Sequence, residues 1–144
     1  MANDYAGEAT VQEAFRAVSR NPNAVIVDVR TDAEWAYVGT PDLEAAPGAL
    51  VRQSWQLFPH MGVDGQFVPH LEQTLRAMGR EPDAPLYFLC RSGVRSLAAA
   101  RAMTAAGWSA AHNITHGFEG DPNGERHRGS VNGWKAAGLP WVQG

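Results

Sequence analysis

A run of β-branched apolar residues near the start of the chain constrains the fold most. Residues 24–29, Ala-Val-Ile-Val-Asp-Val, are apolar at every position except Asp28, without the alternation of a half-exposed strand. This pattern predicts a strand buried on both faces, as in a parallel sheet covered by helices. A shorter apolar run at residues 86–89 predicts another strand.

Helix signals alternate with these strands. Capping-box patterns at Thr10 and Thr31, each with Glu three residues later, open helices expected over about 11–19 and 31–38. The other expected elements are helices over 67–78, 96–106 and 130–137, short strands at 49–51 and 112–114, and loops at 39–48 and 60–65. The alternation predicts an α/β fold with a mainly parallel sheet.

Length and charge limit the possible classes of protein. The chain has 144 residues, so we expect one domain over residues 1–144, with about 1–8 and 142–144 as flexible ends. The net charge of −3 gives no global basic field, so neither nucleic acid nor a membrane is an expected partner. No apolar run approaches the roughly 18 residues that a membrane span needs.

The chain contains a single cysteine, Cys90, which cannot form an internal disulfide. Together with an N-terminus that lacks a basic and then apolar signal segment, this favours a reducing, cytoplasmic location. His112 and His116 are four residues apart, but they lie in an expected strand and turn. Without helical spacing they do not predict a shared metal, and no metal site is expected.

The segment Cys90 to Ser96, Cys-Arg-Ser-Gly-Val-Arg-Ser, lies between a predicted buried strand and the start of a predicted helix. Unpaired N–H groups and the helix dipole at such a position make an anion-binding cradle. Those dipoles and the neighbouring Arg91 and Arg95 would stabilise a Cys90 thiolate. Gly93 allows a positive φ and a close approach of the backbone to a ligand.

The alternative is that Cys90 is a small buried apolar residue at a strand end, as free cysteines often are. Arg91 and Arg95 argue against that interpretation, because positive charge at a helix N-terminus opposes the dipole unless an anion lies nearby. We therefore interpret the segment as a reactive site. Asp28 to Arg30 follow the neighbouring predicted strand and are expected beside it, at the edge where α/β folds bind ligands.

These motifs resemble those of rhodanese-like domains. Residues 90–95 resemble the six-residue active-site loop of that family, and the similarity extends over roughly residues 8–142. Other segments that resemble family motifs are residues 27–30 together with Glu34-Trp35, residues 47–49, residues 117–120, and the tail at 132–135 and 138–141. Two segments differ from the family pattern: residues 39–43 replace Gly-His-Ile, and residues 121–129 form a longer segment, expected as a surface loop.

The resemblance implies a three-layer α/β/α domain that transfers sulfur without a metal or organic cofactor. The Cys90 thiolate would take a sulfur atom from thiosulfate or a similar small anionic donor and pass it, from a persulfide, to a thiol, a protein acceptor or cyanide. The residues expected to bind the substrate are Arg91, Ser92, Gly93, Val94, Arg95 and Ser96.

The resemblance also suggests roles for the charged residues. Arg95 is expected to contact a substrate oxyanion, and Arg91 to point outward and steer its approach. Arg30 is expected to pair with Asp28 or Glu34 and fix the sheet edge, with Asp28 orienting the region.

Three other functions are compatible with the fold. A Cys-dependent phosphatase or arsenate reductase is disfavoured, because only four residues separate Cys90 from Arg95 and phosphatase loops of this type are one residue longer. A carrier loaded with sulfur by a partner protein remains open, and so does a non-catalytic interaction domain. The presence of Cys90 favours chemistry over the latter.

Overall fold

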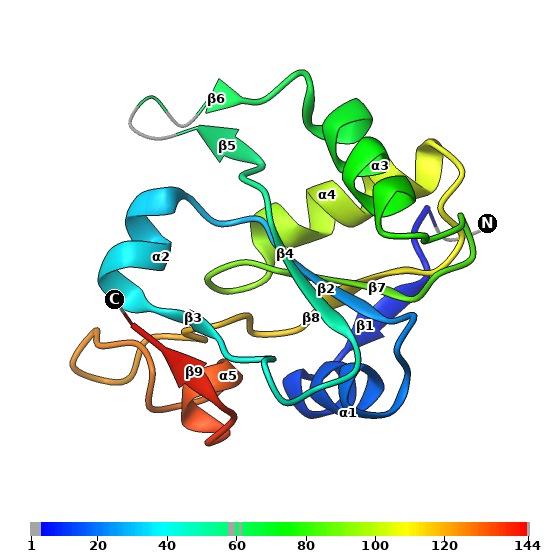
Figure 1. Ribbon diagram of the computed structural model, residues 1–144. Coiled ribbons are helices and arrows are strands. Elements are labelled where there is room, and N and C mark those ends of the chain that lie inside the picture. Colours follow the sequence, from blue (N-terminus) through cyan, green and yellow to red (C-terminus); the bar gives the residue numbers. More distant parts are fainter. Residues whose placement is uncertain (1–3, 58–59, 61, 144) are drawn as a thin grey trace.

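A five-stranded sheet runs through the middle of the protein (Figure 1). The computed structural model describes residues 4–57, 60 and 62–143. Every neighbouring pair of strands in this sheet is parallel, in the order β1-β8-β7-β2-β4. These strands are β1 (Gly7–Ala9), β2 (Val25–Asp28), β4 (Ala49–Arg52), β7 (Leu86–Leu89) and β8 (Ala111–Ile114).

Helices cover both faces of the sheet and make the expected three-layer α/β/α arrangement (Figure 1). One face packs against α3 (Phe67–Ala77) and α4 (Val94–Ala105), and the other against α1 (Val11–Arg20) and α5 (Gly133–Ala136). The remaining helix, α2 (Asp32–Val38), follows the carboxyl end of β2. The prediction of an α/β fold with a mainly parallel sheet is confirmed.

Strand β2 shows why an apolar run without alternation predicted this position. Val25 and Val27 pack into the core beneath α3 and α4, whereas Ile26 packs on the opposite face with side chains of α1. All three side chains are fully buried. Since successive side chains of a strand point to opposite faces, only a strand covered on both sides needs apolar residues at neighbouring positions.

The structure contains strands that the sequence did not predict. Gly7 and Glu8, which were assigned to a flexible end, belong to β1 and pair with β8. The expected loop at 39–48 begins with β3 (Thr40–Pro41), which pairs with β9 (Trp141–Val142) in a small antiparallel sheet. A second small sheet joins β5 (Gln56–Leu57) to β6 (Gly62–Val63), where a loop over 60–65 was expected.

The helix starts follow local chemistry. Both predicted capping boxes are present, since the side chains of Thr10 and Thr31 each accept from the backbone of the Glu three residues later. Helix α4 begins at Val94, two residues before the predicted start, after Gly93 in a left-handed conformation with φ of +111°. Arg95 and Ser96 therefore lie in its first turn. The predicted terminal helix is shorter than expected and covers only α5.

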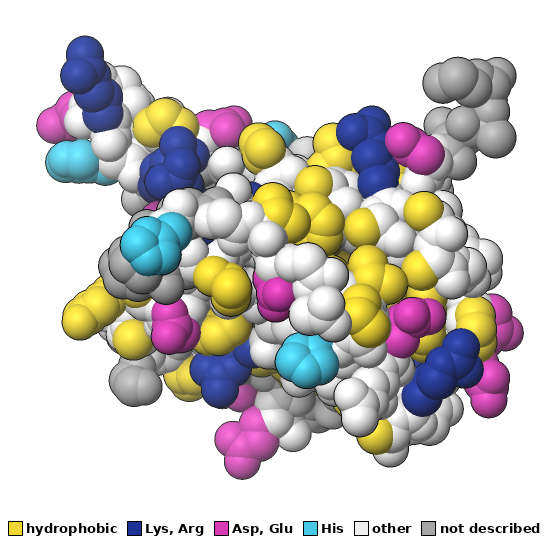
Figure 2. Space-filling model, turned by 90° about the horizontal axis from the view of Figure 1, so that it is seen from above, with side chains coloured by type: hydrophobic (Ala, Val, Ile, Leu, Met, Phe, Trp, Pro, Cys, Tyr) yellow, Lys and Arg dark blue, Asp and Glu magenta, His cyan; other side chains and the backbone are white. Residues whose placement is uncertain are grey.

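Charged side chains of both signs are interspersed on the face shown in Figure 2, with no continuous basic patch. Within the described ranges, no helix is both long enough and apolar enough to cross a membrane. Most of the segment 121–129, expected as a surface loop, is exposed.

Candidate active site

The carboxyl ends of β2 and β7 lie side by side. In the pairing of these two strands, Asp28 is opposite Leu89, the residue before Cys90. The N–H group of Val29 donates to the carbonyl oxygen of Leu89 at 2.8 Å, which continues the pairing by one residue. The expectation that the Asp28 and Cys90 motifs are neighbours in space is confirmed.

The sulfur of Cys90 is buried and held by the loop that follows it. Cys90 is 1% exposed. Its Sγ atom accepts a hydrogen bond from the N–H group of Gly93 at 3.0 Å and lies 3.2 Å from Oγ of Ser96. Gly93 has a left-handed backbone conformation, and the chain enters α4 directly after it. The loop is therefore wrapped around the thiol.

The segment after β8 binds the carbonyl groups of this loop from outside. The N–H group of Phe118 donates to the Cys90 carbonyl at 2.8 Å, and the N–H group of Glu119 donates to the Arg91 carbonyl at 3.0 Å. Gly117 makes this close approach possible, because a Cβ atom there would lie 2.3 Å from the Cys90 carbonyl oxygen. Two carbonyl groups of the loop, those of Cys90 and Arg91, are thus held by this segment.

The N–H groups of the same loop remain available. In the part of the chain that the structure describes, no hydrogen-bond acceptor contacts the N–H groups of Arg91, Ser92, Val94, Arg95 and Ser96. Three of these groups belong to the first turn of α4, which has no side-chain cap. Unpaired N–H groups at a helix start favour an anion or a polarisable sulfur atom nearby.

Arg95 is bound by Glu34 of α2. Its two terminal nitrogens lie 2.6 Å and 2.9 Å from the two carboxylate oxygens, which makes a bidentate pair. Burial by itself raises the pKa of Glu34, but the hydrogen bonds from Arg95 and from the Thr31 backbone outweigh it and hold that pKa at about 2. The bond to Glu34 in turn raises the pKa of Arg95. Sequence reasoning did not foresee this partner for Arg95.

Arg30 pairs with Asp28, one of its two expected partners. The guanidinium donates to both carboxylate oxygens, at 2.9 Å and 2.7 Å, and to the carbonyl of Gly39 at 2.7 Å. Both side chains are fully buried, and the Arg30 guanidinium lies 4.2 Å from the centre of the Phe118 ring. The pair therefore joins the end of β2 to the end of α2 and to the segment that binds the Cys90 loop.

A pocket of about 720 Å³ opens beside Cys90. Of the predicted residues, Cys90, Arg91, Ser92, Val94, Arg95 and Glu34 line this pocket. Gly93 and Ser96 contact the Cys90 sulfur but do not line the pocket. Asp28 and Arg30 do not line it either and are fully buried. The lining residues that sequence reasoning missed are Thr31, Ala33, Val38, Gln56 and Glu119.

The pocket beside Cys90 is lined by equal numbers of positive and negative side chains. Two arginines, Arg91 and Arg95, are matched by two carboxylates, Glu34 and Glu119. Arg91 is exposed, in line with its expected outward orientation. Because Arg95 is committed to Glu34, the electrostatic attraction for a small dianion is weaker than the sequence of the loop alone suggests.

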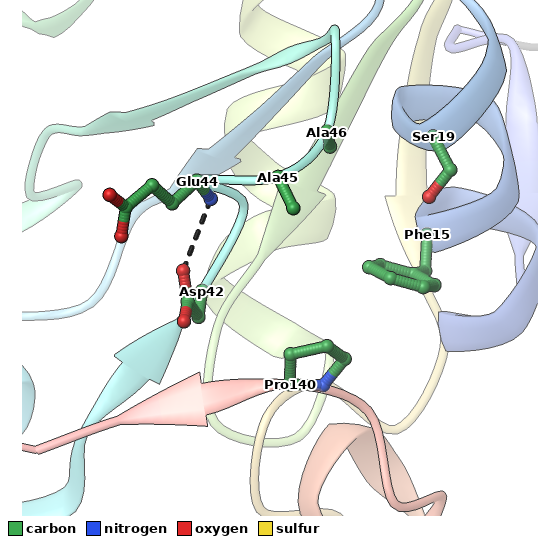
Figure 3. A pocket seen from close by; sticks show the side chains of 7 residues that line it. All are labelled: Phe15, Ser19, Asp42, Glu44, Ala45, Ala46 and Pro140. Carbon is green, nitrogen blue, oxygen red and sulfur yellow. Dashed lines mark hydrogen bonds between the residues drawn. The ribbon is translucent and has the colours of Figure 1, made fainter.

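A second hollow of about 450 Å³ shares no residue with this pocket. Figure 3 shows Phe15 and Ser19 of α1 facing the segment 42–46 and Pro140 across it. The N–H group of Glu44 donates to the Asp42 carboxylate at its rim. None of the predicted site residues lies there.

Comparison with known protein families agrees with this geometry. Residues 11–121 match the family model described as a rhodanese-like domain. The chain belongs to the rhodanese-like family. The match includes the Cys90 loop, the Asp28–Arg30 strand end and the segment that binds the loop carbonyls.

Several proteins are similar to this rhodanese-like domain over nearly its whole length. The crystal structure of Rv0390 from M. tuberculosis is 44% identical, covers 97% of this chain and 99% of its own, and superposes with a TM-score of 0.86. Uncharacterized proteins of Rickettsia conorii and Rickettsia prowazekii are 35% and 33% identical, over 90% of this chain and 91% of theirs.

A solution structure of a polysulfide-sulfur transferase homodimer from Wolinella succinogenes shares the fold of this rhodanese-like domain. It has a TM-score of 0.64 and 19% identity and covers 98% of this chain and 80% of its own.

Proposed function

We propose that this rhodanese-like domain is a sulfurtransferase in which Cys90 carries the transferred sulfur as a persulfide. The observation that carries the proposal is the buried Cys90 sulfur, enclosed by a loop whose N–H groups have no other acceptor among the described residues. The polysulfide-sulfur transferase that shares the fold gives additional support.

The first half-reaction loads the enzyme. The Cys90 thiolate attacks the outer sulfur of thiosulfate, a bond forms between Sγ and that sulfur, and the sulfur–sulfur bond of thiosulfate breaks. Sulfite leaves with the electron pair. The new outer sulfur carries negative charge, which the free N–H groups of residues 91, 92 and 94–96 stabilise.

The second half-reaction returns the enzyme to its starting state. A thiolate or cyanide attacks the outer sulfur of the persulfide, takes it, and leaves the electron pair of the broken bond on the Cys90 thiolate. Because the two substrates react in turn at one nucleophile, ping-pong kinetics are expected. A single cysteine that must stay reduced fits a cytoplasmic enzyme.

The charge balance of the pocket favours a second class of donor. Glu34 and Glu119 offset Arg95 and Arg91, so the pocket gives a small dianion little net electrostatic attraction and does not disfavour a donor of low charge, such as a persulfide presented by a partner protein. The short loop disfavours a phosphatase, because only four residues separate Cys90 from Arg95.

The test is the intact mass of the purified protein after incubation with thiosulfate. Wild type should gain about 32 Da, the mass of one sulfur atom, and cyanide should remove it. The Cys90→Ser variant, which changes one buried atom, should fold normally and gain nothing. A protein persulfide donor, tested in parallel, distinguishes a thiosulfate enzyme from a partner-loaded carrier.

Each result has a clear meaning. Loading of wild type by either donor, with none on Cys90→Ser, supports the persulfide step. Failure of both donors to load wild type, or equal loading of the two proteins, would refute the proposed function.

A further inference from the structure

A chain of hydrogen bonds leads from Cys90 through the sheet to a carboxylate at its edge. Oγ of Ser96 lies 3.2 Å from the Cys90 sulfur and 2.5 Å from Oδ1 of Asn113 on β8. The side-chain amide of Asn113 donates to the carboxylate of Glu8 on β1, at 3.1 Å and 3.2 Å. Ser96 and Asn113 are 0% and 3% exposed, so water does not replace these partners.

The orientation of the Asn113 side chain is fixed by its neighbours. Its Nδ2 group faces the Glu8 carboxylate and, at 3.2 Å, the carbonyl of Gly93. Both are acceptors, so the NH₂ group must point toward them and Oδ1 must point toward Ser96. Glu8 is held in turn by the hydroxyl of Thr115 at 3.0 Å and that of Tyr5 at 2.7 Å.

This orientation determines what the Ser96 hydroxyl can do. Oδ1 of Asn113 can only accept, so Ser96 donates its single proton to it. The lone pairs of Ser96 then face Cys90, where they suit a protonated thiol that donates its S–H. A thiolate at Cys90 would gain a further hydrogen bond from the Ser96 hydroxyl, but Asn113 competes for that proton.

We propose that Asn113 is a positioning residue that holds the Ser96 hydroxyl proton away from the Cys90 sulfur and so limits how much of Cys90 is thiolate. Turning the proton toward the thiolate would leave the buried Oδ1 of Asn113 without a donor, which carries a free-energy cost. A persulfide has no S–H on Sγ and leaves the bond between Ser96 and Asn113 undisturbed. The proposal deepens the proposed function, in which Cys90 is the nucleophile.

Other charged groups near Cys90 also affect how readily its thiol ionises. They come from the loop and α4, from α2, from the segment after β8 and from the end of β2. These groups are Arg91, Arg95, Glu34, Glu119, Asp28 and Arg30. Because Asn113→Leu and Ser96→Ala neither alter these groups nor add a charge, a change in thiolate formation in these variants reports on the chain of Ser96 and Asn113.

The test is the rate of Cys90 alkylation by iodoacetamide as a function of pH. Asn113→Leu removes the competing acceptor at nearly constant size, so Ser96 is free to donate to the thiolate. We expect the midpoint of the profile to fall by about one pH unit, the effect of one hydrogen bond to a charged group. Asn113→Asp keeps an acceptor oxygen but adds a carboxylate beside that of Glu8, so the midpoint should rise and not fall.

A double-mutant cycle separates this mechanism from a general change in packing. In a Ser96→Ala background, Asn113→Leu should have no further effect on the midpoint, because the proton for which Asn113 competes is absent. The same fall in both backgrounds, or no fall in the single variant, would overturn the proposal.

A further measurement stands if Asn113→Leu does not fold. Ser96→Ala alone should leave the midpoint unchanged or lower it slightly, because in the wild type Ser96 gives its proton to Asn113 and can only accept from the Cys90 thiol. A rise of about one pH unit in that variant would mean that Ser96 already donates to the thiolate, and the proposal would be wrong. Alkylation needs no sulfur donor, so these results are independent of whether the protein transfers sulfur.

Discussion

Replacing Gly117 with Ala tests whether the segment after β8 holds the Cys90 loop in place. Gly117 has a φ of +66°, and a Cβ atom there would lie 2.3 Å from the Cys90 carbonyl oxygen and 2.7 Å from that of Arg91. Turning a side chain cannot relieve contacts with backbone atoms, so the two segments must move apart. The hydrogen bonds from the N–H groups of Phe118 and Glu119 to the loop are then lost.

Gly138 provides a matched control. Its φ is +74°, and a Cβ atom there would meet nothing within 4 Å. Gly138→Ala therefore carries only the cost of a left-handed non-glycine residue, about 1–2 kcal/mol. Gly117→Ala carries that cost and also loses backbone hydrogen bonds worth about 0.5–1.5 kcal/mol each. We expect Gly117→Ala to lower the free energy of unfolding by about 2 kcal/mol more than Gly138→Ala.

Urea unfolding of the two variants and wild type measures this difference, and mass spectrometry after incubation with a sulfur donor measures the effect on Cys90. Gly117→Ala should also load sulfur poorly, because the loop is displaced, whereas Gly138→Ala should load like wild type. Equal losses of stability, within about 0.5 kcal/mol, together with equal loading would refute the reasoning.

Three further predictions concern the ion pairs. Arg30→Met leaves the Asp28 carboxylate buried without its cation and should cost about 3–5 kcal/mol in urea unfolding, with part recovered by adding Asp28→Asn. The pKa of Glu34 is about 2 in the folded protein, against an ordinary value of 4.5. The ionised carboxylate therefore stabilises the folded protein above about pH 5, and this stabilisation is lost as the pH falls toward about 2. Urea unfolding across that range should show a flatter profile for Glu34→Gln, and equal slopes would contradict it. Arg95→Ala leaves Glu34 unpaired beside the pocket and should raise the KM for thiosulfate, with partial recovery on adding Glu34→Gln; an unchanged KM would remove the assigned role of Arg95.

The parts of this structure that could be predicted from the sequence depend on patterns within a few neighbouring residues. Residues 86–89 form the predicted strand, and β2 covers four of the six residues in the apolar run at 24–29, because burial on both faces requires such runs. The capping boxes at Thr10 and Thr31 are satisfied within four residues and need no distant partner. The Cys90 loop was recognisable because a nucleophile, arginines and a glycine lie together in the chain.

The features that sequence reasoning missed depend on distant partners. The tripeptide Gly7–Ala9 has no strand pattern and becomes a strand only by pairing with β8. Glu34 and Arg95 are 61 positions apart, and a capping box alone explains why Glu34 is present. Asn113 lies in a short predicted strand, where nothing in the sequence shows that its amide faces Ser96.

The order of strands in the central sheet has a consequence for how the protein is made on the ribosome. Strand β1 emerges first but pairs only with β8, and the Cys90 carbonyl finds its partner only when residue 118 has been translated. At about 5–20 residues per second, about 1–6 s pass between the synthesis of Cys90 and that of Phe118. The loop around the Cys90 sulfur is therefore completed only after the segment that follows β8 has been synthesised, late in the translation of the chain.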